Sequence, residues 1–169
     1  ALIKKLLAVR PDMIVTMVAG SPFSMTEWID PTDTLLLSYY AGMETGRAFA
    51  NLLFGEVSPS GKLPTTYPKE LSDSPAHSIG QFGTSTDVSY AEDVYVGYRY
   101  FDSVDKQPMF PFGYGLGYTS FEIATKDAVL DGSKVSVTAR VTNTGKRPGK
   151  EVVQLYVSIP EGKLDQPYQ

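Results

Sequence analysis

Clusters of apolar residues alternate with polar ones over the first third of the chain, at two different spacings. The apolar residues of positions 2–7 share one helical face with two lysines off it, which predicts an amphipathic helix ending at Pro11. Two compact apolar runs, Met13–Ala19 and Thr34–Tyr39, are typical of strands covered on both faces, as in a parallel sheet. Gly42–Phe54 returns to helical spacing, and Gly55 predicts its end.

These elements predict a parallel βαβ arrangement, because strands separated by helical segments need a crossover connection. Ser24 and Glu27 have the spacing of a capping box, so we also predict a short helix through Trp28. Two strands are too few for an independently stable sheet. We therefore expect the rest of this layer to precede residue 1, within a longer protein.

A long segment rich in Pro, Gly, Ser and aromatic residues follows, from Pro59 to about Tyr118. Its prolines and glycines leave little room for regular helices or strands. The many Tyr and Phe side chains oppose disorder, because leaving them in water is costly. We predict an ordered, extended strap. Such segments in compact proteins tend to be functional or to form interfaces.

The final part of the chain shows the two-residue period of β-structure. Apolar and polar residues alternate strictly over Val135–Thr142, which predicts a half-buried strand. Phe121–Leu130 and Glu151–Ile159 are predicted as further strands, with turn residues around Asn143 and Gly149. About three antiparallel strands are therefore expected. An immunoglobulin-type sandwich has about seven, so the sequence predicts about half of one.

Composition and charge argue against several classes of function and of site. The net charge is −4 over 169 residues and the cations are scattered, which argues against nucleic-acid binding. The absence of cysteine and the single histidine, His77, argue against a disulfide framework and a zinc site. We expect no metal and no cofactor. The apolar run Met13–Ala19 is far shorter than a membrane span of about 20 residues, and the start of the chain lacks the features of a signal peptide.

Two motifs have structural interpretations. Gly113–Gly117 is glycine-rich but lacks the spacing and the preceding strand of a phosphate-binding loop, so a tight, backbone-packed bend is predicted. His77 lies between Pro75 and Gly80, for which we predict a surface or structural role.

Carboxylates are the remaining candidates for chemistry. Glu92 and Asp93 are adjacent, and neighbours on an extended segment point to opposite faces, which makes them a poor catalytic pair. One of them, with Tyr90 or Tyr95 stacking on a ring, is a candidate for the rim of a sugar site; a salt-bridged structural role is the alternative. Trp28, the single tryptophan, is a further rim candidate, with core packing as its alternative. Glu44 suits the first turn of a helix.

Four motifs in order resemble glycoside hydrolase family 3. Asn51–Pro68 reads NLLFGEVSPSGKLPTTYP and resembles the family's LFG-x-x-N-P-S-G-K-L-P-x-T-x-P. Val94–Asp102, VYVGYRYFD, is similar to VGYRYYD, and Pro108–Phe121, PMFPFGYGLGYTSF, to PLFPFGYGLSYTTF. The strand pair of Val141–Gly145 and Glu151–Val157 resembles the opening of the family's fibronectin-type-III-like domain. The resemblance covers essentially the whole chain.

The resemblance implies a fold class and a domain plan. Residues 1–68 would end the family's α/β-sandwich domain, as a partial parallel layer. Residues 69–118 would form the irregular aromatic linker, and residues 119–169 the first half of the fibronectin-type-III-like β-sandwich. The implied fold class is thus α/β, with a partial antiparallel β-sandwich at its end.

It also implies an activity: removal of β-linked glucosyl, xylosyl or related residues from non-reducing ends, with retention of configuration. The implied partners are an oligosaccharide or β-glycoside substrate and an N-terminal barrel of the same parent chain. The barrel would carry the nucleophilic aspartate, and an upstream loop the acid/base glutamate. Neither motif occurs here, so no catalytic residue is expected within this chain.

The chain departs from the family pattern at two places. Ala41–Gly46 reads AGMETG where many members read PGQEGG, and Asp93 replaces a glycine before the Val94–Asp102 motif. The second change puts the usual loop shape in question.

Three hypotheses remain open. The chain is the framework end of a β-glycosidase, a non-catalytic carbohydrate-binding or adhesion module, or a self-sufficient hydrolase using Glu92 or Asp93.

Overall fold

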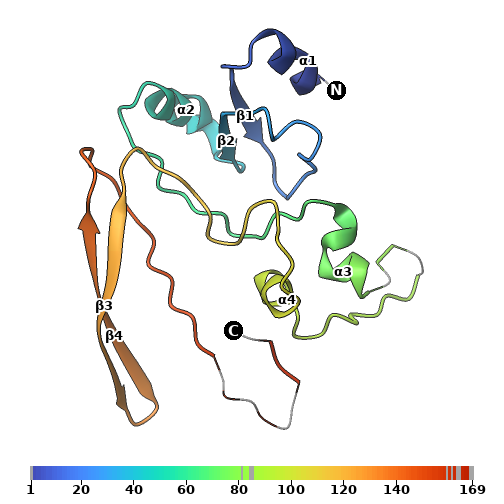
Figure 1. The fold of residues 1–169 in the computed structure, drawn as a ribbon, viewed down its shortest axis with the longest axis vertical. Helices are drawn as coiled ribbons and strands as arrows, with labels where there is room; N and C mark the ends of the chain where they lie inside the picture. The colour runs from blue at the N-terminus through green and yellow to red at the C-terminus, as the bar shows by residue number, and fades with distance from the viewer. Residues whose placement is uncertain are drawn as a thin grey trace. The chain divides into compact units, whose positions relative to one another are not determined.

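The computed structural model describes residues 2–80, 82–83, 86–158, 160, 162 and 165–167. These residues form two compact units (Figure 1). The first comprises Ala1–Met43, Leu63–Tyr114 and Tyr156–Gln169, and the second Glu44–Lys62 and Gly115–Leu155. Both helices and strands are present, in small sheets, so the predicted mixed α/β class is confirmed.

The first unit begins with helix α1 (Leu2–Val9) and strands β1 (Ile14–Val18) and β2 (Thr34–Ser38). The strands pair in parallel, with Ile14 opposite Thr34, as predicted from the two apolar runs separated by a crossover connection. Residues 26–28 form a turn and residues 24–25 belong to no regular element, so the predicted helix is absent from this described segment. The backbone N–H of Ile29 does bond the Met25 carbonyl at 2.9 Å, but Pro31 follows, and proline disfavours helical backbone in the residue before it.

A small core lies on this sheet. Its buried members are Leu7, Val15, Met25, Trp28 and Tyr67. The strands themselves are less covered than predicted, since half of the Ile14 and Val18 surfaces are exposed. The expected burial on both faces is therefore wrong for the described residues, because α1, the turn after β1 and strap residues such as Tyr67 leave one face of β1 exposed.

Helix α2 (Thr45–Leu53) opens the second unit and follows the 3₁₀ turn η1 (Gly42–Glu44). Glu44 stands at its N-cap and pairs with Arg47 at 3.3 Å, which agrees with the predicted first-turn role. The helix ends at Leu53, with Phe54 as its C-cap. Gly55 follows with a φ of +77°, in the left-handed region that glycine adopts without strain. The predicted helix and its end are confirmed.

Most of the strap is irregular but ordered. Within it lie three short helices, η2 (Leu71–Asp73), α3 (Pro75–Ser78) and α4 (Tyr98–Ser103). An isolated antiparallel bridge joins Tyr67 to Phe110, and the Gly113 N–H bonds the Leu63 carbonyl at 2.8 Å. These contacts hold residues 63–67 beside residues 110–113 within the first unit.

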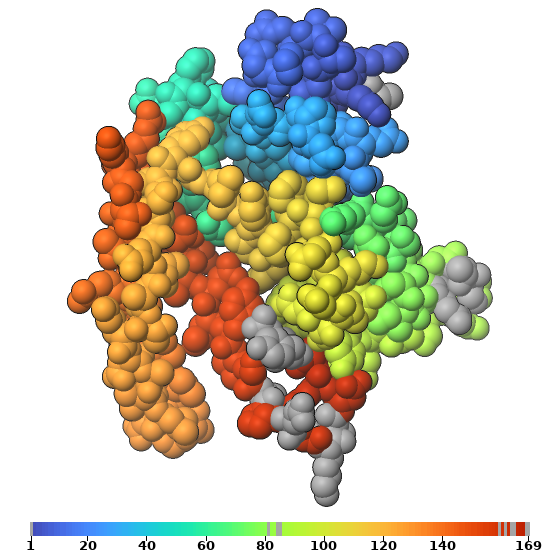
Figure 2. Space-filling view, viewed as in Figure 1, coloured from blue at the N-terminus to red at the C-terminus, as the bar shows by residue number. Residues whose placement is uncertain are grey.

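The second unit ends in a hairpin of β3 (Phe121–Asp131) and β4 (Lys134–Asn143), antiparallel, with a bulge between Thr125 and Asp127. Figure 2 shows this hairpin in orange, and every residue of β4 is exposed. The half-buried face predicted for β4 is therefore absent from the described residues. The third predicted strand is also absent, since residues 151–158 carry no ladder hydrogen bonds and Ile159 lies outside the described residues.

Glycines permit close backbone packing in the second unit. A Cβ on Gly117 would lie 2.7 Å from the Pro59 carbonyl oxygen, and one on Gly115 would overlap the Gly61 carbonyl. The predicted tight bend is thus confirmed. Among the described helices, none combines the length and apolar character needed to cross a bilayer.

Candidate functional site

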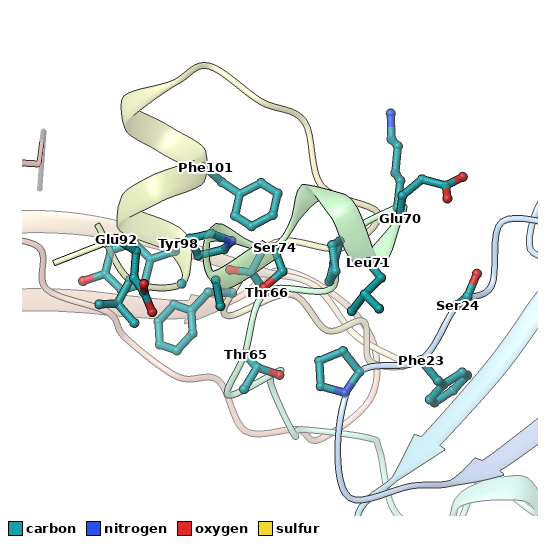
Figure 3. Close-up of a pocket in the computed structure, with 18 of the residues that line it drawn as sticks. Phe23, Ser24, Thr65, Thr66, Glu70, Leu71, Ser74, Glu92, Tyr98 and Phe101 are labelled. Carbon is teal, nitrogen blue, oxygen red and sulfur yellow. The ribbon is translucent and has the colours of Figure 1, made fainter. Parts of the chain in front are cut away.

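A cavity of about 580 Å³ lies in the first unit (Figure 3). Three parts of the chain enclose it: the loop after β1, the strap segment that begins at Pro64, and the region around α4. Its volume falls within the range of small-molecule sites, about 300–1,000 Å³. In open α/β sheets, ligands commonly bind beyond the carboxyl ends of the strands, and the loop after β1 is such an end.

Four aromatic rings and four prolines are among the residues that line the cavity. The rings include Phe23, Tyr98, Phe101 and Phe112. Tyr98 stacks on Phe112 with 5.0 Å between ring centroids, and Phe101 is 4% exposed. A wall of this kind favours apolar groups or the C–H face of a sugar ring over an ion.

Glu92 is the sequence-predicted rim residue that lines this cavity. Figure 3 shows it with Tyr98 among the labelled residues. The Glu92 side chain lies close to the segment after α3, because a Cβ on Gly80 would lie 3.3 Å from the Glu92 Oε2 atom. Sequence spacing alone placed Glu92 beside aromatic residues, and the structure adds the cavity.

Asp93 belongs to the same turn, but with an unusual backbone. Its φ of +46° is in the left-handed region, which is uncommon for a residue with a side chain although Asp tolerates it better than most. Its N–H bonds the Tyr90 carbonyl at 3.2 Å, and the Tyr95 N–H bonds the Glu92 carbonyl at 2.8 Å. Asp93 replaces the family's glycine here, and a positive φ is what that glycine would supply without strain.

Tyr95 is held by the end of the chain. Its hydroxyl donates to Asp165 Oδ1 at 2.5 Å and to the Gln166 carbonyl at 3.3 Å. The hydrogen bond to Asp165 raises the pKa of Tyr95, because ionisation would break it. Tyr95 does not line the cavity, so Glu92 and Tyr95 face different surroundings.

Trp28 is 7% exposed and belongs to the core. Its ring stacks on Phe23 at 6.5 Å between centroids. Phe23 also meets Tyr67 edge-on at 6.0 Å. Of the two interpretations given to Trp28, core packing is the one this burial favours, with Phe23 standing between it and the cavity.

Two threonines that sequence analysis did not single out also line the cavity, Thr65 and Thr66. Tyr39 Oη lies 3.5 Å from Thr65 Oγ1 and 3.3 Å from Tyr67 Oη, which forms a short chain of hydroxyls. Burial raises the pKa of Tyr67, and the bond to Tyr39 adds to the shift. The Thr66 Oγ1 atom is buried without a hydrogen-bond partner in the described structure. Neither residue belongs to a periodic pattern, so only the strap's overall character pointed here.

No group of three His, Asp or Glu side chains suited to a metal ion occurs among the described residues. His77 packs against Phe82 at 5.1 Å between ring centroids, and its Nδ1 atom is buried without a described partner. This packing favours the predicted structural role.

Comparison with known proteins gives a consistent result. Residues 1–118 match the model described as "Glycosyl hydrolase family 3 C-terminal domain". Beta-glucosidase BoGH3A of Bacteroides ovatus is 42% identical over 98% of this chain, which spans 23% of that protein. Thermostable beta-glucosidase B of Acetivibrio thermocellus is also 42% identical, over 98% of this chain and 22% of its own length.

Solved structures agree with the sequence matches. A beta-glucosidase from Kluyveromyces marxianus in complex with glucose superposes with a TM-score of 0.92 at 37% identity, covering 99% of this chain and 20% of that one. Beta-glucosidase 3B from Thermotoga neapolitana, in complex with alpha-D-glucose, gives 0.87 at 42% identity over 99% and 24%. The chain thus spans about a quarter or less of the length of these relatives.

Proposed function

Because the chain belongs to glycoside hydrolase family 3, we propose that it is a C-terminal part of a retaining, exo-acting β-glycosidase of the β-glucosidase or β-xylosidase type. The observation that supports this most directly is the match over nearly the whole chain to several proteins named as beta-glucosidases. The parent's substrate would be a β-glycoside or oligosaccharide.

In this proposal the chain supplies framework and one edge of the substrate site. The nucleophile and the acid/base would come from preceding parts of the parent, the barrel in particular. Glu92 would belong to the substrate rim, since it lines an aromatic cavity of a size suited to a ligand. Asp93 would act by fixing the shape of the Glu92 turn, and Tyr95 by anchoring that turn to Asp165.

The domain plan is also a proposal. Residues 1–68 would close an α/β-sandwich domain, residues 69–118 would link it onward, and residues 119–169 would begin a fibronectin-type-III-like sandwich. The end of the family match at residue 118 supports the last boundary. The long β3–β4 hairpin, with alternating residues and exposed apolar side chains, supports a sandwich that further strands would complete.

An activity assay tests the main proposal. The full-length parent and the isolated 169-residue chain are each given aryl β-glucoside and aryl β-xyloside. We expect turnover by the parent and none by the isolated chain. Turnover by the isolated chain would instead support a self-sufficient hydrolase, and a parent that binds glycans without turnover would support a carbohydrate-binding module.

A substitution tests the rim. In the parent, Glu92→Gln is expected to raise KM for the aryl β-glucoside about threefold to tenfold with little change in kcat, because it removes a charged hydrogen-bond acceptor while leaving its shape. Glu27→Gln is the matched control, since Glu27 is exposed and lies outside the cavity lining. An unchanged KM for Glu92→Gln would exclude Glu92 from the rim.

A further inference from the structure

A second cavity, of about 320 Å³, lies on α4 and the loop that follows it, within the first unit. It shares Thr66, Tyr98, Phe101 and Phe112 with the larger cavity. The rest of its lining combines Pro108, Pro111 and Tyr156 with four polar or charged residues, Asp102, Asp105, Lys106 and Gln107. The volume is at the lower end of the range for small-molecule sites, which suits one sugar ring rather than a chain of them.

The apolar part of this cavity is a corner of three aromatic rings. Tyr98 and Phe112 stack at 5.0 Å with 24° between their planes. Tyr156 stands nearly perpendicular to Tyr98, at 83° and 5.6 Å between ring centroids. Two ring planes at a right angle offer both a face and an edge to a ligand, and aromatic faces attract the weakly positive C–H groups of an apolar surface.

The polar part contains both acceptors and donors. The carboxylates of Asp102 and Asp105 accept hydrogen bonds, the Gln107 amide can do both, and the Lys106 ammonium donates. Lys106 is fixed in place by Asp73, with 2.7 Å between Nζ and Oδ1. The Asp102 carboxylate lies close enough to Tyr156 for its charge to raise the pKa of that hydroxyl, after the larger effect of burial and that of Tyr98.

This combination of charged, amide and aromatic groups fits some classes of ligand better than others. A metal ion or an organic cation would use the acceptors only and leave the Lys106 and Gln107 donors in the lining without a role. An anion would be repelled by Asp102 and Asp105. A neutral ring that bears several hydroxyls and a C–H face uses carboxylate, amide, ammonium and aromatic groups together.

We propose that this second cavity binds a single neutral pyranose sugar. The sugar's hydroxyls bond Asp105 and Gln107, and its C–H face packs against the Tyr98, Phe112 and Tyr156 corner. This assignment stands on the cavity's own lining and does not depend on the parent's hydrolytic activity.

Hydroxyl-radical footprinting of the full-length parent, with D-glucose and D-xylose as probes, tests the site. Because binding covers the rings, oxidation of Tyr98 and Tyr156 is expected to slow at least twofold as the sugar is raised through the millimolar range. Choline chloride is the matched cationic probe and is expected to give no protection. Absence of sugar protection at these tyrosines, or equal protection by choline, would overturn the proposal.

Two variants sharpen the test. Asp105 has a φ of +49°, and Asn accepts that backbone region readily, so Asp105→Asn removes the charge without disturbing the turn. Asp105→Asn and Gln107→Ala are each expected to raise the sugar concentration for half-maximal protection about fivefold or more. Glu122→Gln, on β3, is the control and is expected to leave it unchanged.

The β-glycosidase proposal and the second-cavity proposal can be contradicted independently of each other. A parent that hydrolyses aryl β-glucoside but shows no sugar protection at Tyr98 and Tyr156 contradicts only the second-cavity site. A parent without turnover that shows the protection contradicts only the β-glycosidase.

Discussion

Lys62 carries a half-buried charge that three parts of the second unit share. Its ammonium donates to the Gly115 carbonyl at 2.6 Å and lies 2.9 Å from Glu151 Oε1. Both side chains are 18% exposed, unlike the exposed pair of Arg10 and Asp12. A partly buried pair with a further hydrogen bond is worth more than a surface pair, which typically contributes about 0–1 kcal/mol.

The pH dependence of this pair can be predicted. Lys62, and the Val152 N–H after it, lower the pKa of Glu151. A lowered pKa stabilises the fold above the unfolded value of about 4.3, and the contribution is lost as the pH falls through the folded value. Amide hydrogen exchange in the parent, corrected for intrinsic rates, should therefore show weaker protection around Gly115 at pH 4 than at pH 6.

Removing the charge should have the same effect at neutral pH. Glu151→Gln is expected to lower the opening free energy around Gly115 by about 1–2 kcal/mol and to abolish the difference between pH 6 and pH 4. Asp12→Asn is the control, because both partners of that pair are about 70% exposed. A Glu151→Gln variant that keeps the pH dependence would show that another group titrates.

Tyr67 is the most buried aromatic side chain described, with no exposed surface. Tyr67→Phe removes only the hydroxyl that meets Tyr39 at 3.3 Å and should cost about 0.5–1.5 kcal/mol. Tyr67→Ala removes the ring against Phe23 and should cost about 3–5 kcal/mol. Calorimetry of the parent measures both. Equal costs for the two variants would mean that the ring contributes little.

Residue-level contacts were the least predictable from the sequence. Lys62 and Glu151 are 89 positions apart, and no periodic pattern relates them. Trp28 fitted two roles until its burial was known, because a tryptophan packs equally well in a core or against a sugar. Glu92 could be proposed as a rim residue from its aromatic neighbours, whereas Thr66 gave no signal at all.

At the scale of elements, the glycine-rich bend makes a clear prediction. Gly117→Ala would place a Cβ 2.7 Å from a backbone carbonyl, which cannot move aside as a flexible side chain can. We expect a lower melting temperature for the parent and faster amide exchange around Pro59. Gly46→Ala in α2 is the matched control: it meets open space, and alanine should stabilise the helix by about 0.5–1 kcal/mol. Equal effects of the two would contradict close packing at Gly117.

Elements with a clear period of apolar residues could be predicted from the sequence. Elements that depend on contacts with distant residues could not. Helices α1 and α2 and all four strands follow their apolar patterns to within a few residues. The helix predicted from the capping-box spacing of Ser24 and Glu27 is absent, because Pro31 follows too soon for a helix. The strand expected at Glu151–Ile159 has the right alternation, but residues 151–158 are not assigned to a strand and Ile159 lies outside the described residues. A strand is defined by its ladder of hydrogen bonds.

At the scale of the whole molecule, each of the two sheets formed by the described residues has two strands and unpaired edges. Such edges template association with other chains. We predict that the isolated chain self-associates at micromolar concentrations, measured by light scattering after size-exclusion chromatography. Val135→Lys, which removes a 60% exposed apolar side chain from β4, should reduce this association. Ser136→Lys adds the same charge without removing apolar surface and should reduce it less. A monomeric isolated chain with a sharp, reversible thermal transition would contradict the prediction.

The bridge between Tyr67 and Phe110 can form only after both residues have been synthesised. The Tyr67 backbone must wait for a partner made roughly forty residues later, which takes about 2–8 s at ribosomal rates of about 5–20 residues per second. A hairpin such as β3–β4, by contrast, can form in about 1–10 μs once both strands have emerged. During those seconds, the Tyr67 side chain lacks the part of its cover that Met109 and Phe110 supply. The nascent chain is then most in need of a chaperone, and slower codons between the two positions would lengthen that exposure.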